Sequence, residues 1–380
     1  MAKSFKVAII GAGPAGSSCG YFLSRAGIEN VIFEKEKLPR QKVCAGGITS
    51  RIESLFDFDI TCKIQNKIKN ILFCWQDKEF LLSLDLPFIY TVERSEFDSY
   101  LVEQAVKKGT KLYDNTKVER VEKNTLYTTK GVFKADYIVD ATGASCLLSR
   151  KKGFKRSWAR TIQAWVKVPE DVLDRFREKI RADFSFVFPG WAWVFPRKDK
   201  LVVGTGFLDS FPRGKRKLKK VLLTYLDFLF PSGCRVLKVA SSPINLFSGR
   251  EKIAQDNFIL IGEAGGFVDP LSGEGIFWAI KSAKLAADFL KESIVKGEKD
   301  CSFFGKIVEE KIYPHLRFFR FISSFFYRAP CFFFKQLERE KKIATSYLRM
   351  LRGEFDIPPF YLKKPLLSLP FLFVRFFRSF

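Results

Sequence analysis

The first 34 residues predict two strands and a helix joined by a glycine-rich turn, an order that few folds accommodate. An apolar, β-branched run at 5–10 predicts a strand buried on both faces. The residues after it have helical periodicity and stop at Gly27, and 30–33 is a second short apolar run. The N-terminus is therefore expected to be a βαβ unit with parallel strands.

The turn between the first strand and the helix reads Gly11-Ala-Gly13-Pro-Ala-Gly16, a spacing suited to a diphosphate. Gly11 permits the tight turn, Gly13 lets the backbone approach a pyrophosphate, and Gly16 lets helix and strand pack closely. Glu34 follows the second strand, where its carboxylate can accept hydrogen bonds from a ribose. A glycine-rich turn without a ligand is the alternative. With strand, helix and acid in register, the pattern predicts an α/β fold with a Rossmann-like dinucleotide-binding domain.

Two later segments favour FAD over NAD as the dinucleotide. Residues 136–145 read as a buried strand running into a glycine turn, and 256–262 as another strand, followed by Glu263 and a glycine-rich loop. An acid past a strand end can hold a polyol hydroxyl. The helix that opens after Gly275 can face a heterocycle that becomes anionic on reduction. FAD, longer than NAD by a flavin and a ribityl chain, uses such a second clamp.

Alternating stretches between 151 and 250, such as 160–167 and 182–188, predict the antiparallel sheet of a substrate domain. Its many aromatic residues suit a long apolar tunnel, with an ordinary sheet core as the alternative. The expected FAD domain is discontinuous and the C-terminal region is helical. We expect the FAD domain at 1–50, 88–150 and 251–295, the substrate domain at 51–87 and 151–250, and the helical region at 296–380.

The composition is basic and rich in phenylalanine, with a net charge of +24 and 42 Phe among 380 residues. Such a charge implies anionic partners, and because no nucleic-acid-binding module is recognised, a membrane surface or a phosphorylated substrate is favoured. The run 213–220 is either a solvated basic loop or a contact with headgroups or a substrate diphosphate.

One apolar helical stripe near the C-terminus favours membrane contact. Phe319, Ile322 and Phe326, with Phe318 and Phe325, are expected to face away from a polar stripe. That polar stripe consists of Arg317, Arg320, Ser324 and Arg328. A basic amphipathic helix of this kind can lie in a membrane interface, and a cap packed on the substrate domain is the alternative. The terminal segment 365–380 is again apolar and basic.

The eight cysteines form no CxxC pair and the only histidine is His315, so metal sites built on Cys or His pairs are excluded. The N-terminus has no signal-peptide pattern, and no charge-free window is long enough to span a bilayer. We expect a cytoplasmic protein with reduced cysteines, peripheral at the cytoplasmic face of the membrane.

Six motifs spread from residue 7 to about 290 resemble the geranylgeranyl reductase family, which belongs to the glutathione-reductase-like flavoproteins that also include aromatic hydroxylases. They are the N-terminal fingerprint, RSEFD from Arg94, the DATG turn at 140–143, GEAGGFVDPLSGEGI at 262–276, and two further stretches. These two are RQKVCAGG at 40–47, similar to the family's R-x-K-x-C-x-G-G loop, and GWAWVFP at 190–196, similar to its Y-x-W-x-F-P signature. Digeranylgeranylglycerophospholipid reductases are similar within this family. Two departures are Glu263, where the family has Asp, and Trp191, where it has Tyr.

The resemblance implies particular FAD contacts beside the glycines of the first turn. They are Ala15, Glu34, Cys44, Ala45, Gly47, Arg94, Val118, Gly262, Glu263, Gly275 and Ile276. Trp191, Trp193, Phe195 and Pro196 are implied as substrate-lining residues. Arg94 also makes sense as a cation that reaches the diphosphate, or else as a solvated charge at a helix start. Cys44 is equally a small buried hydrophobe, and with Gly47 it is only a candidate for a place near the flavin reaction.

The implied activity is reduction of isolated carbon–carbon double bonds in geranylgeranyl chains of a prenyl diphosphate or prenylated lipid. No second G-x-G-x-x-G occurs, so the electrons are expected from transiently bound NAD(P)H or a ferredoxin-like donor. A flavin monooxygenase or halogenase on the same scaffold is the enzymatic alternative. The non-enzymatic alternative is a membrane-associated flavoprotein that binds isoprenoids without reducing them.

Overall fold

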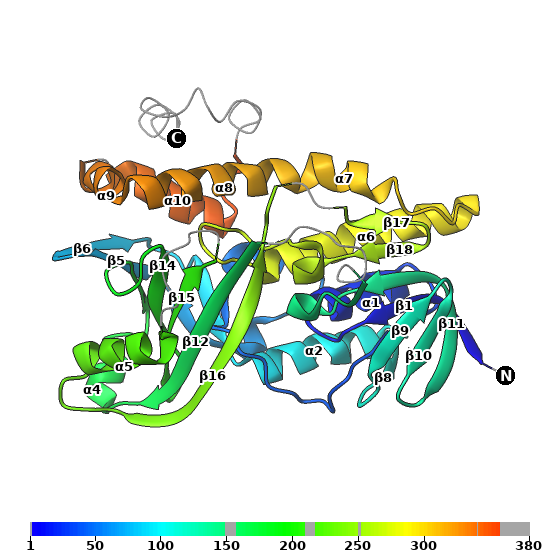
Figure 1. Cartoon of the computed structure of the whole chain (residues 1–380), viewed down its shortest axis with the longest axis horizontal. Helices are drawn as coiled ribbons and strands as arrows, with labels where there is room; N and C mark the ends of the chain where they lie inside the picture. The colour runs from blue at the N-terminus through cyan, green and yellow to red at the C-terminus, as the bar shows by residue number, and fades with distance from the viewer. Residues whose placement is uncertain (1, 149–156, 210–216, 250–251, 340, 358–380) are drawn as a thin grey trace. The chain divides into compact units, whose positions relative to one another are not determined.

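The computed structural model describes residues 2–148, 157–209, 217–249, 252–339 and 341–357. The chain divides into two compact units, each assembled from three separate segments. Unit 1 comprises 1–42, 94–156 and 245–317, and unit 2 comprises 43–93, 157–244 and 318–380. Both units combine sheets with helices, which confirms the expected α/β fold class (Figure 1).

Unit 1 is built on a mainly parallel sheet with the strand order β17-β18-β11-β1-β2-β8. Strand β1 lies between β11 and β2 and runs parallel to both, and β18 and β8 extend the parallel part on either side. Strands β9 and β10 form an antiparallel extension on β11. The bounds are β1 (Lys3–Ile10), β2 (Asn30–Phe33), β8 (Lys111–Tyr113), β9 (Val118–Glu122), β10 (Thr125–Thr128), β11 (Gly131–Asp140), β17 (Ala254–Gln255) and β18 (Phe258–Leu260).

Helices α1 and α6 of unit 1 pack against each other, and α1 also packs on α2 (Figure 1). The strand–helix–strand order expected at the N-terminus is present as β1, α1 and β2, and all four residues of β2 are buried. The helical bounds are α1 (Pro14–Arg25), α2 (Arg94–Lys107), α6 (Ile276–Lys296) and α7 (Phe304–Lys311), with short 3-10 turns η3 (Gly143–Ser145) and η4 (Gly262–Gly265).

Unit 2 contains a seven-stranded sheet and a three-stranded sheet. The larger has the order β16-β12-β15-β14-β13-β5-β6, and the smaller is β3-β7-β4. In the larger sheet β13 and β5 are parallel, whereas β12, β15, β14 and β13 pair antiparallel in turn. The bounds are β3 (Gly47–Thr49), β4 (Ile64–Ile68), β5 (Asn70–Trp75), β6 (Lys78–Ser83), β7 (Ile89–Val92), β12 (Ser157–Lys167), β13 (Lys179–Asp183), β14 (Gly190–Pro196), β15 (Leu201–Leu208) and β16 (Arg235–Leu246). Short turns η1 (Ser50–Leu55) and η2 (Thr61–Lys63) and helix α4 (Glu170–Asp174) connect them.

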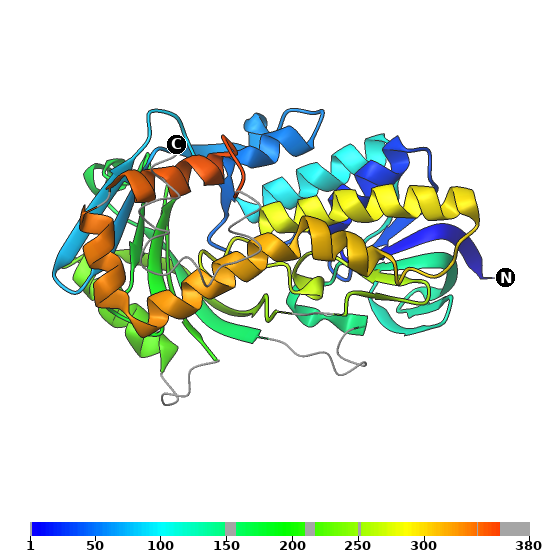
Figure 2. The same cartoon turned by 90° about the horizontal axis from the view of Figure 1, so that it is seen from above.

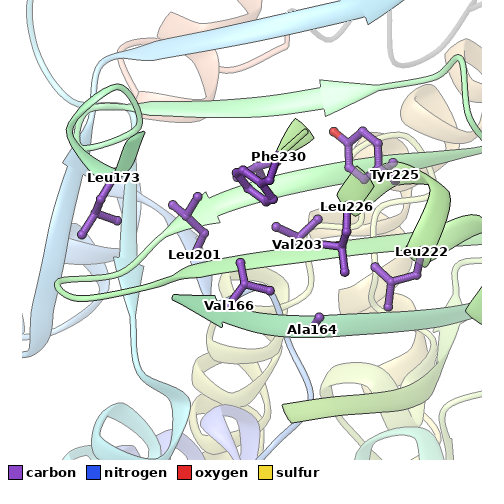
Figure 3. Close-up of a cluster of buried hydrophobic side chains, with 11 residues drawn as sticks. Ala164, Val166, Leu173, Leu201, Val203, Leu222, Tyr225, Leu226 and Phe230 are labelled. Carbon is purple, nitrogen blue, oxygen red and sulfur yellow. The ribbon is translucent and has the colours of Figure 1, made fainter. Parts of the chain in front are cut away.

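Helix α5 (Leu218–Leu229) covers one face of the seven-stranded sheet. Leu222 and Leu226 of the helix pack with Val203, Leu201 and Val166 of the strands, as Figure 3 shows. Alternate residues of each strand point to opposite faces. The other face of β14, β15 and β12 therefore carries Trp191, Trp193 and their neighbours, and it is the face that concerns the site.

The strand expected at 182–188 is wrong beyond Asp183, where β13 ends. The following phenylalanines leave the sheet and pack in different directions. Phe184 contacts Phe326 at a centroid distance of 4.9 Å, whereas Phe186 contacts Tyr225 of α5 at 4.7 Å. The sequence pattern of 182–188 is misleading, because a loop whose alternate side chains pack against different neighbours has the same alternation of apolar and polar residues as a strand.

Three C-terminal helices follow in sequence, α8 (Tyr313–Arg328), α9 (Pro330–Arg339) and α10 (Lys341–Arg352) (Figure 2). The apolar stripe of α8 is present, but Phe319, Ile322 and Phe326 are all buried. Phe318 and Phe325, which were expected beside them, are only half-buried. Since Phe319, Ile322 and Phe326 pack inside the protein, the expectation that this stripe contacts a membrane is wrong. No helix of the described chain is long and apolar enough to cross a bilayer. The segments 213–216 and 365–380 lie outside the described residues.

Candidate functional site

The glycine-rich turn of unit 1 is closed to larger residues at two of its three glycines. A Cβ on Gly16 would lie 1.9 Å from the carbonyl oxygen of Gly11, so the helix could not start where it does. Gly11 has a φ of +103°, and a Cβ there would lie 2.6 Å from the oxygen of Ala141. These close approaches bring the start of α1 against the ends of β1 and β11.

The N-terminus of α1 is left open for an anion. Gly13 is its N-cap and Pro14 is its first residue, and neither a side-chain cap nor an acid in the first turn satisfies its N–H groups. Unpaired N–H groups and the positive end of the helix favour a phosphate here. The backbone at Ala15 and Gly16 therefore fits the diphosphate of a dinucleotide.

Glu34 is buried at the end of β2, beside the same turn. Its Oε2 accepts a hydrogen bond from the backbone N–H of Ala12 at 2.8 Å, and its Oε1 accepts one from Glu36 N–H at 3.2 Å. Thr116 N–H donates to the backbone oxygen of Glu34, which brings Val118 at the start of β9 near this acid along the chain. The carboxylate is thus fixed at the position where a dinucleotide fold holds a ribose.

Two buried arginines share one buried aspartate next to the turn. Arg94 is the first residue of α2, and its Nε and Nη2 donate to the two carboxylate oxygens of Asp98 at 2.8 and 2.9 Å. Arg40 reaches Asp98 through Nη1 at 3.2 Å and Glu34 Oε2 through Nε at 3.2 Å. Arg94 is buried, so it is not the solvated helix-start charge that its position also allowed. The two guanidinium groups and the carboxylates of Asp98 and Glu34 together carry no net formal charge.

Arg40 also belongs to this site, although sequence analysis assigned it no role. A Cβ on Gly13 would lie 3.6 Å from its Nη2, so the guanidinium stands over the glycine-rich turn. A cation beside an open helix N-terminus strengthens the attraction for a diphosphate. Its place in the RQKVC stretch gave no sign of this, because the contact depends on how the chain after β2 folds back.

Gly262 joins the N-terminal half of the site to the second clamp. It has a φ of +59°, and a Cβ on it would lie 2.8 Å from the Cβ of Ala15 and 3.3 Å from that of Ala279. Its N–H donates to Ser282 Oγ at 3.0 Å. Helices α1 and α6 consequently start close together at this glycine, although their first residues, Pro14 and Ile276, are 262 positions apart in the sequence.

The remaining residues of the second clamp lie around this glycine. Glu263 is held by Asn245, whose N–H donates to Glu263 Oε1 at 3.0 Å, and its Oε2 would lie 3.4 Å from a Cβ on Gly143 of the DATG turn. Gly275 is the N-cap residue of α6 and provides no side-chain cap, and Ile276 is the first residue of the helix, whose first turn has no acid. An uncapped N-terminus of a 21-residue helix suits a heterocycle that accepts negative charge. Unit 1 therefore fits FAD at both ends.

The loop that holds Cys44, Ala45 and Gly47 belongs to unit 2 and is fixed on the sheet face opposite α5. Gln163 Nε2 donates to the oxygen of Cys44 at 3.1 Å, and the Arg197 guanidinium donates to the oxygen of Ala45. A Cβ on Gly47 would lie 2.6 Å from the ring of Phe195. Sequence analysis did not predict these contacts. They are evident only from the structure, in which Arg197 directly follows β14 and is buried.

Three of the four expected substrate residues share this sheet face. Trp193 lies over Gly204 of the neighbouring strand, where a Cβ would meet its indole ring at 2.3 Å. Trp191 and Phe195 are two residues away on the same strand and point to the same side. Pro196 belongs to the opposite set, because its partner Leu201 packs in the core under α5. The face is thus aromatic and apolar around Trp193.

Comparison with known proteins gives a family whose description is "FAD binding domain" over residues 4–190. The geranylgeranyl diphosphate reductase of a Synechocystis strain is 30% identical over 77% of each chain. The digeranylgeranylglycerophospholipid reductase of Methanococcus vannielii is 28% identical over 77% of this chain and 78% of its own. The tryptophan 2-halogenase of Chondromyces crocatus is 24% identical over 85% of this chain and 68% of its own.

Among solved structures, a geranylgeranyl bacteriochlorophyll reductase-like protein from Thermoplasma acidophilum superimposes with a TM-score of 0.77 over 100% of both chains, at 18% identity. At that identity the structural likeness shows the fold alone. The FAD-binding domain match includes the glycine-rich turn at 11–16 and the turn at 140–143, and the Synechocystis reductase is 30% identical over 77% of each chain. The chain belongs to the geranylgeranyl reductase family of FAD-dependent oxidoreductases.

Proposed function

We propose that the chain reduces isolated carbon–carbon double bonds in geranylgeranyl or similar polyprenyl chains, carried by a prenyl diphosphate or a prenylated lipid. The observation that carries this proposal is the aromatic face of unit 2, where Trp191, Trp193 and Phe195 lie on the side of the sheet that holds the Cys44–Gly47 loop. Relatives named as geranylgeranyl reductases support the same substrate class.

FAD, when bound and reduced, supplies the hydride. In this proposal the Glu34 carboxylate of unit 1 holds a ribose and the open start of α1 binds the diphosphate, and the nearby positive charges of Arg40 and Arg94 support this. Gly262 allows α1 and α6 to begin side by side, so one extended ligand can reach both helix ends.

In unit 2, the aromatic face is proposed to bind the alkene. An isolated double bond has no carbonyl to polarise, so a proton that reaches one carbon builds positive charge on the other. The ring faces of Trp191 and Trp193 can stabilise such a charge. The polar side chains Gln163 and Arg197 of this face donate to the backbone oxygens of Cys44 and Ala45. The proposed contacts with the alkene are therefore made by the aromatic rings.

The electron source is proposed as NAD(P)H or a ferredoxin-like protein, and the site of action as the cytoplasmic face of a membrane, where a prenylated lipid is found. A flavin halogenase or monooxygenase is the second candidate function, and the halogenase relative favours it. An isoprenoid-binding flavoprotein without activity is the third.

One experiment separates these functions. The FAD-loaded protein is incubated without oxygen with geranylgeranyl diphosphate and a chemical reductant, and the products are analysed by mass spectrometry. Gain of two hydrogen atoms per double bond supports the reductase. A product that appears only in air and carries oxygen or a halide identifies the second candidate, and no product with full FAD binding identifies the third.

A matched pair of variants ties the activity to the aromatic face. Trp193→Ala is expected to lower turnover at least tenfold while FAD still binds, because it removes the ring that covers Gly204. Phe303→Ala removes an exposed aromatic side chain of unit 1 and is expected to leave turnover unchanged. Equal turnover in both variants would contradict the proposed alkene site.

A further inference from the structure

The outer side of α8 carries a set of cations and aromatic rings that the packing of the helix does not use. Phe319 and Phe326 are buried, and the opposite side of the helix presents Arg320 and Arg328 exposed, with Phe325 half-buried between them in sequence. Phe321 is half-buried on the same outer side, four residues before Phe325. The helix is therefore apolar inside and both aromatic and basic outside.

Helix α9 continues this surface. Phe332 is 42% exposed and its ring lies 5.9 Å from that of Phe325, edge to face. Lys335 is exposed one turn further along, while Phe334 of the same helix is buried against Trp75. We name this surface the basic aromatic face, made of Arg320, Phe321, Phe325, Arg328, Phe332 and Lys335. Figure 2 shows α8 and α9 as consecutive helices.

Acidic side chains do not neutralise the basic aromatic face. Helix α8 contains no Asp or Glu, and the one acid of α9, Glu338, pairs with Lys78 at 3.1 Å. Within the described part of the chain, Arg320, Arg328 and Lys335 form no ion pair. Three uncompensated cations around exposed and half-exposed phenylalanines are unusual for a surface that faces only water.

We propose that the basic aromatic face docks on an anionic phospholipid surface. Phenylalanine rings enter the boundary between headgroups and acyl chains, and arginine and lysine keep their charge at the phosphates while their alkyl stems lie in the apolar layer. This docking proposal rests on the proposed function, because an enzyme that acts on a prenylated lipid has to take its substrate from a bilayer. The contact is made by the side of α8 opposite to the buried stripe.

The test measures binding of the full-length, FAD-loaded protein to vesicles. Sedimentation with phosphatidylcholine vesicles is compared with and without phosphatidylglycerol. Each cation close to an anionic bilayer strengthens binding by about fivefold. The triple variant R320Q/R328Q/K335Q is therefore expected to lose about a hundredfold in partition to the anionic vesicles.

A second triple variant controls for net charge. Lys107, Lys123 and Lys134 are exposed in unit 1, and K107Q/K123Q/K134Q removes the same charge. This variant is expected to bind within about threefold of the unchanged protein, because its residues lie outside the docking face. Both variants change only exposed side chains, and circular dichroism with FAD content checks their folding.

Three results would overturn the proposal. They are no binding of the unchanged protein to anionic vesicles, equal losses in the two triple variants, and unchanged binding of R320Q/R328Q/K335Q. The last result would point to an acidic partner protein on this face. Vesicle binding needs no prenyl reduction, and reduction of a detergent-solubilised prenyl substrate by the same variants is expected to be normal. Failure of the docking proposal is thus distinguishable from failure of the proposed function.

Discussion

Replacing Asp98 by asparagine tests whether the buried charge cluster beside the glycine-rich turn stabilises unit 1. The carboxylate accepts from Arg94 through both oxygens and from Arg40 through one. Its side chain is 1% exposed, and those of the two arginines are 7% and 10% exposed. The substitution keeps the shape of the side chain but leaves two guanidinium groups against the single carboxylate of Glu34.

The expected loss is large because the uncompensated charge stays buried. Removing one partner of a buried ion pair costs about 3–5 kcal/mol. For a folding unit of this size, about 2–4 °C of melting temperature correspond to 1 kcal/mol, so Asp98→Asn is expected to melt roughly 6–20 °C lower. Scanning calorimetry of the FAD-free protein measures the shift without a contribution from ligand binding.

The same substitution at an exposed pair is the control. Lys6 and Asp136 also lie 2.8 Å apart, but their side chains are 42% and 40% exposed. An exposed pair contributes about 0–1 kcal/mol, so Asp136→Asn is expected to melt within a few degrees of the unchanged protein. If Asp98→Asn cost less than about 1 kcal/mol, or no more than Asp136→Asn, the argument from burial would be refuted.

Two further predictions concern unit 2. Gly46→Ala is expected to cost about 2–4 kcal/mol, because φ is +67° and a Cβ would lie 2.2 Å from Arg197 Nη2 and 2.4 Å from the oxygen of Val92, whereas Gly27→Ala, with φ +75° and open space, is expected to cost only about 1–2 kcal/mol; urea unfolding compares them. Burial raises the pKa of Tyr90 from its ordinary value of 10.0 to about 12. The folded state therefore favours the neutral phenol, and this stabilisation is present below pH 10.0 and lost as the pH rises to about 12. Urea midpoints across this range should fall more steeply for the unchanged protein than for Tyr90→Phe, and equal slopes would speak against it.

Local patterns predicted the parts of the fold that depend on neighbours in sequence. The strand at 30–33 and the helix that follows Gly275 are found where periodicity and glycine placement put them. The strand at 182–188 was wrong after Asp183, since alternating burial arose from packing on two sides of a loop. The membrane-facing stripe around Phe319 was wrong because an amphipathic pattern does not say what covers the apolar side.

The candidate site also contains some residues that sequence analysis identified and others that it did not. Gly16 and Glu34 were identifiable because the turn, the helix end and the acid follow one another within a few tens of residues. Arg197 and Gln163 were not, because they reach Ala45 and Cys44 across 152 and 119 residues of chain. Such contacts exist only where the strands of unit 2 pair into their sheet.

The amino-acid sequence alone settles the class of cofactor and the βαβ start of the fold, since glycine spacing and strand or helix periodicity act through bonds and short-range sterics. Folding in three dimensions settles the partners of buried charges. Asp98 binds two arginines. The side of α8 that stays exposed carries arginines and phenylalanines, whereas the predicted apolar stripe around Phe319 is buried. The reason is that burial and desolvation depend on every segment that packs around a side chain, and no local pattern contains that information.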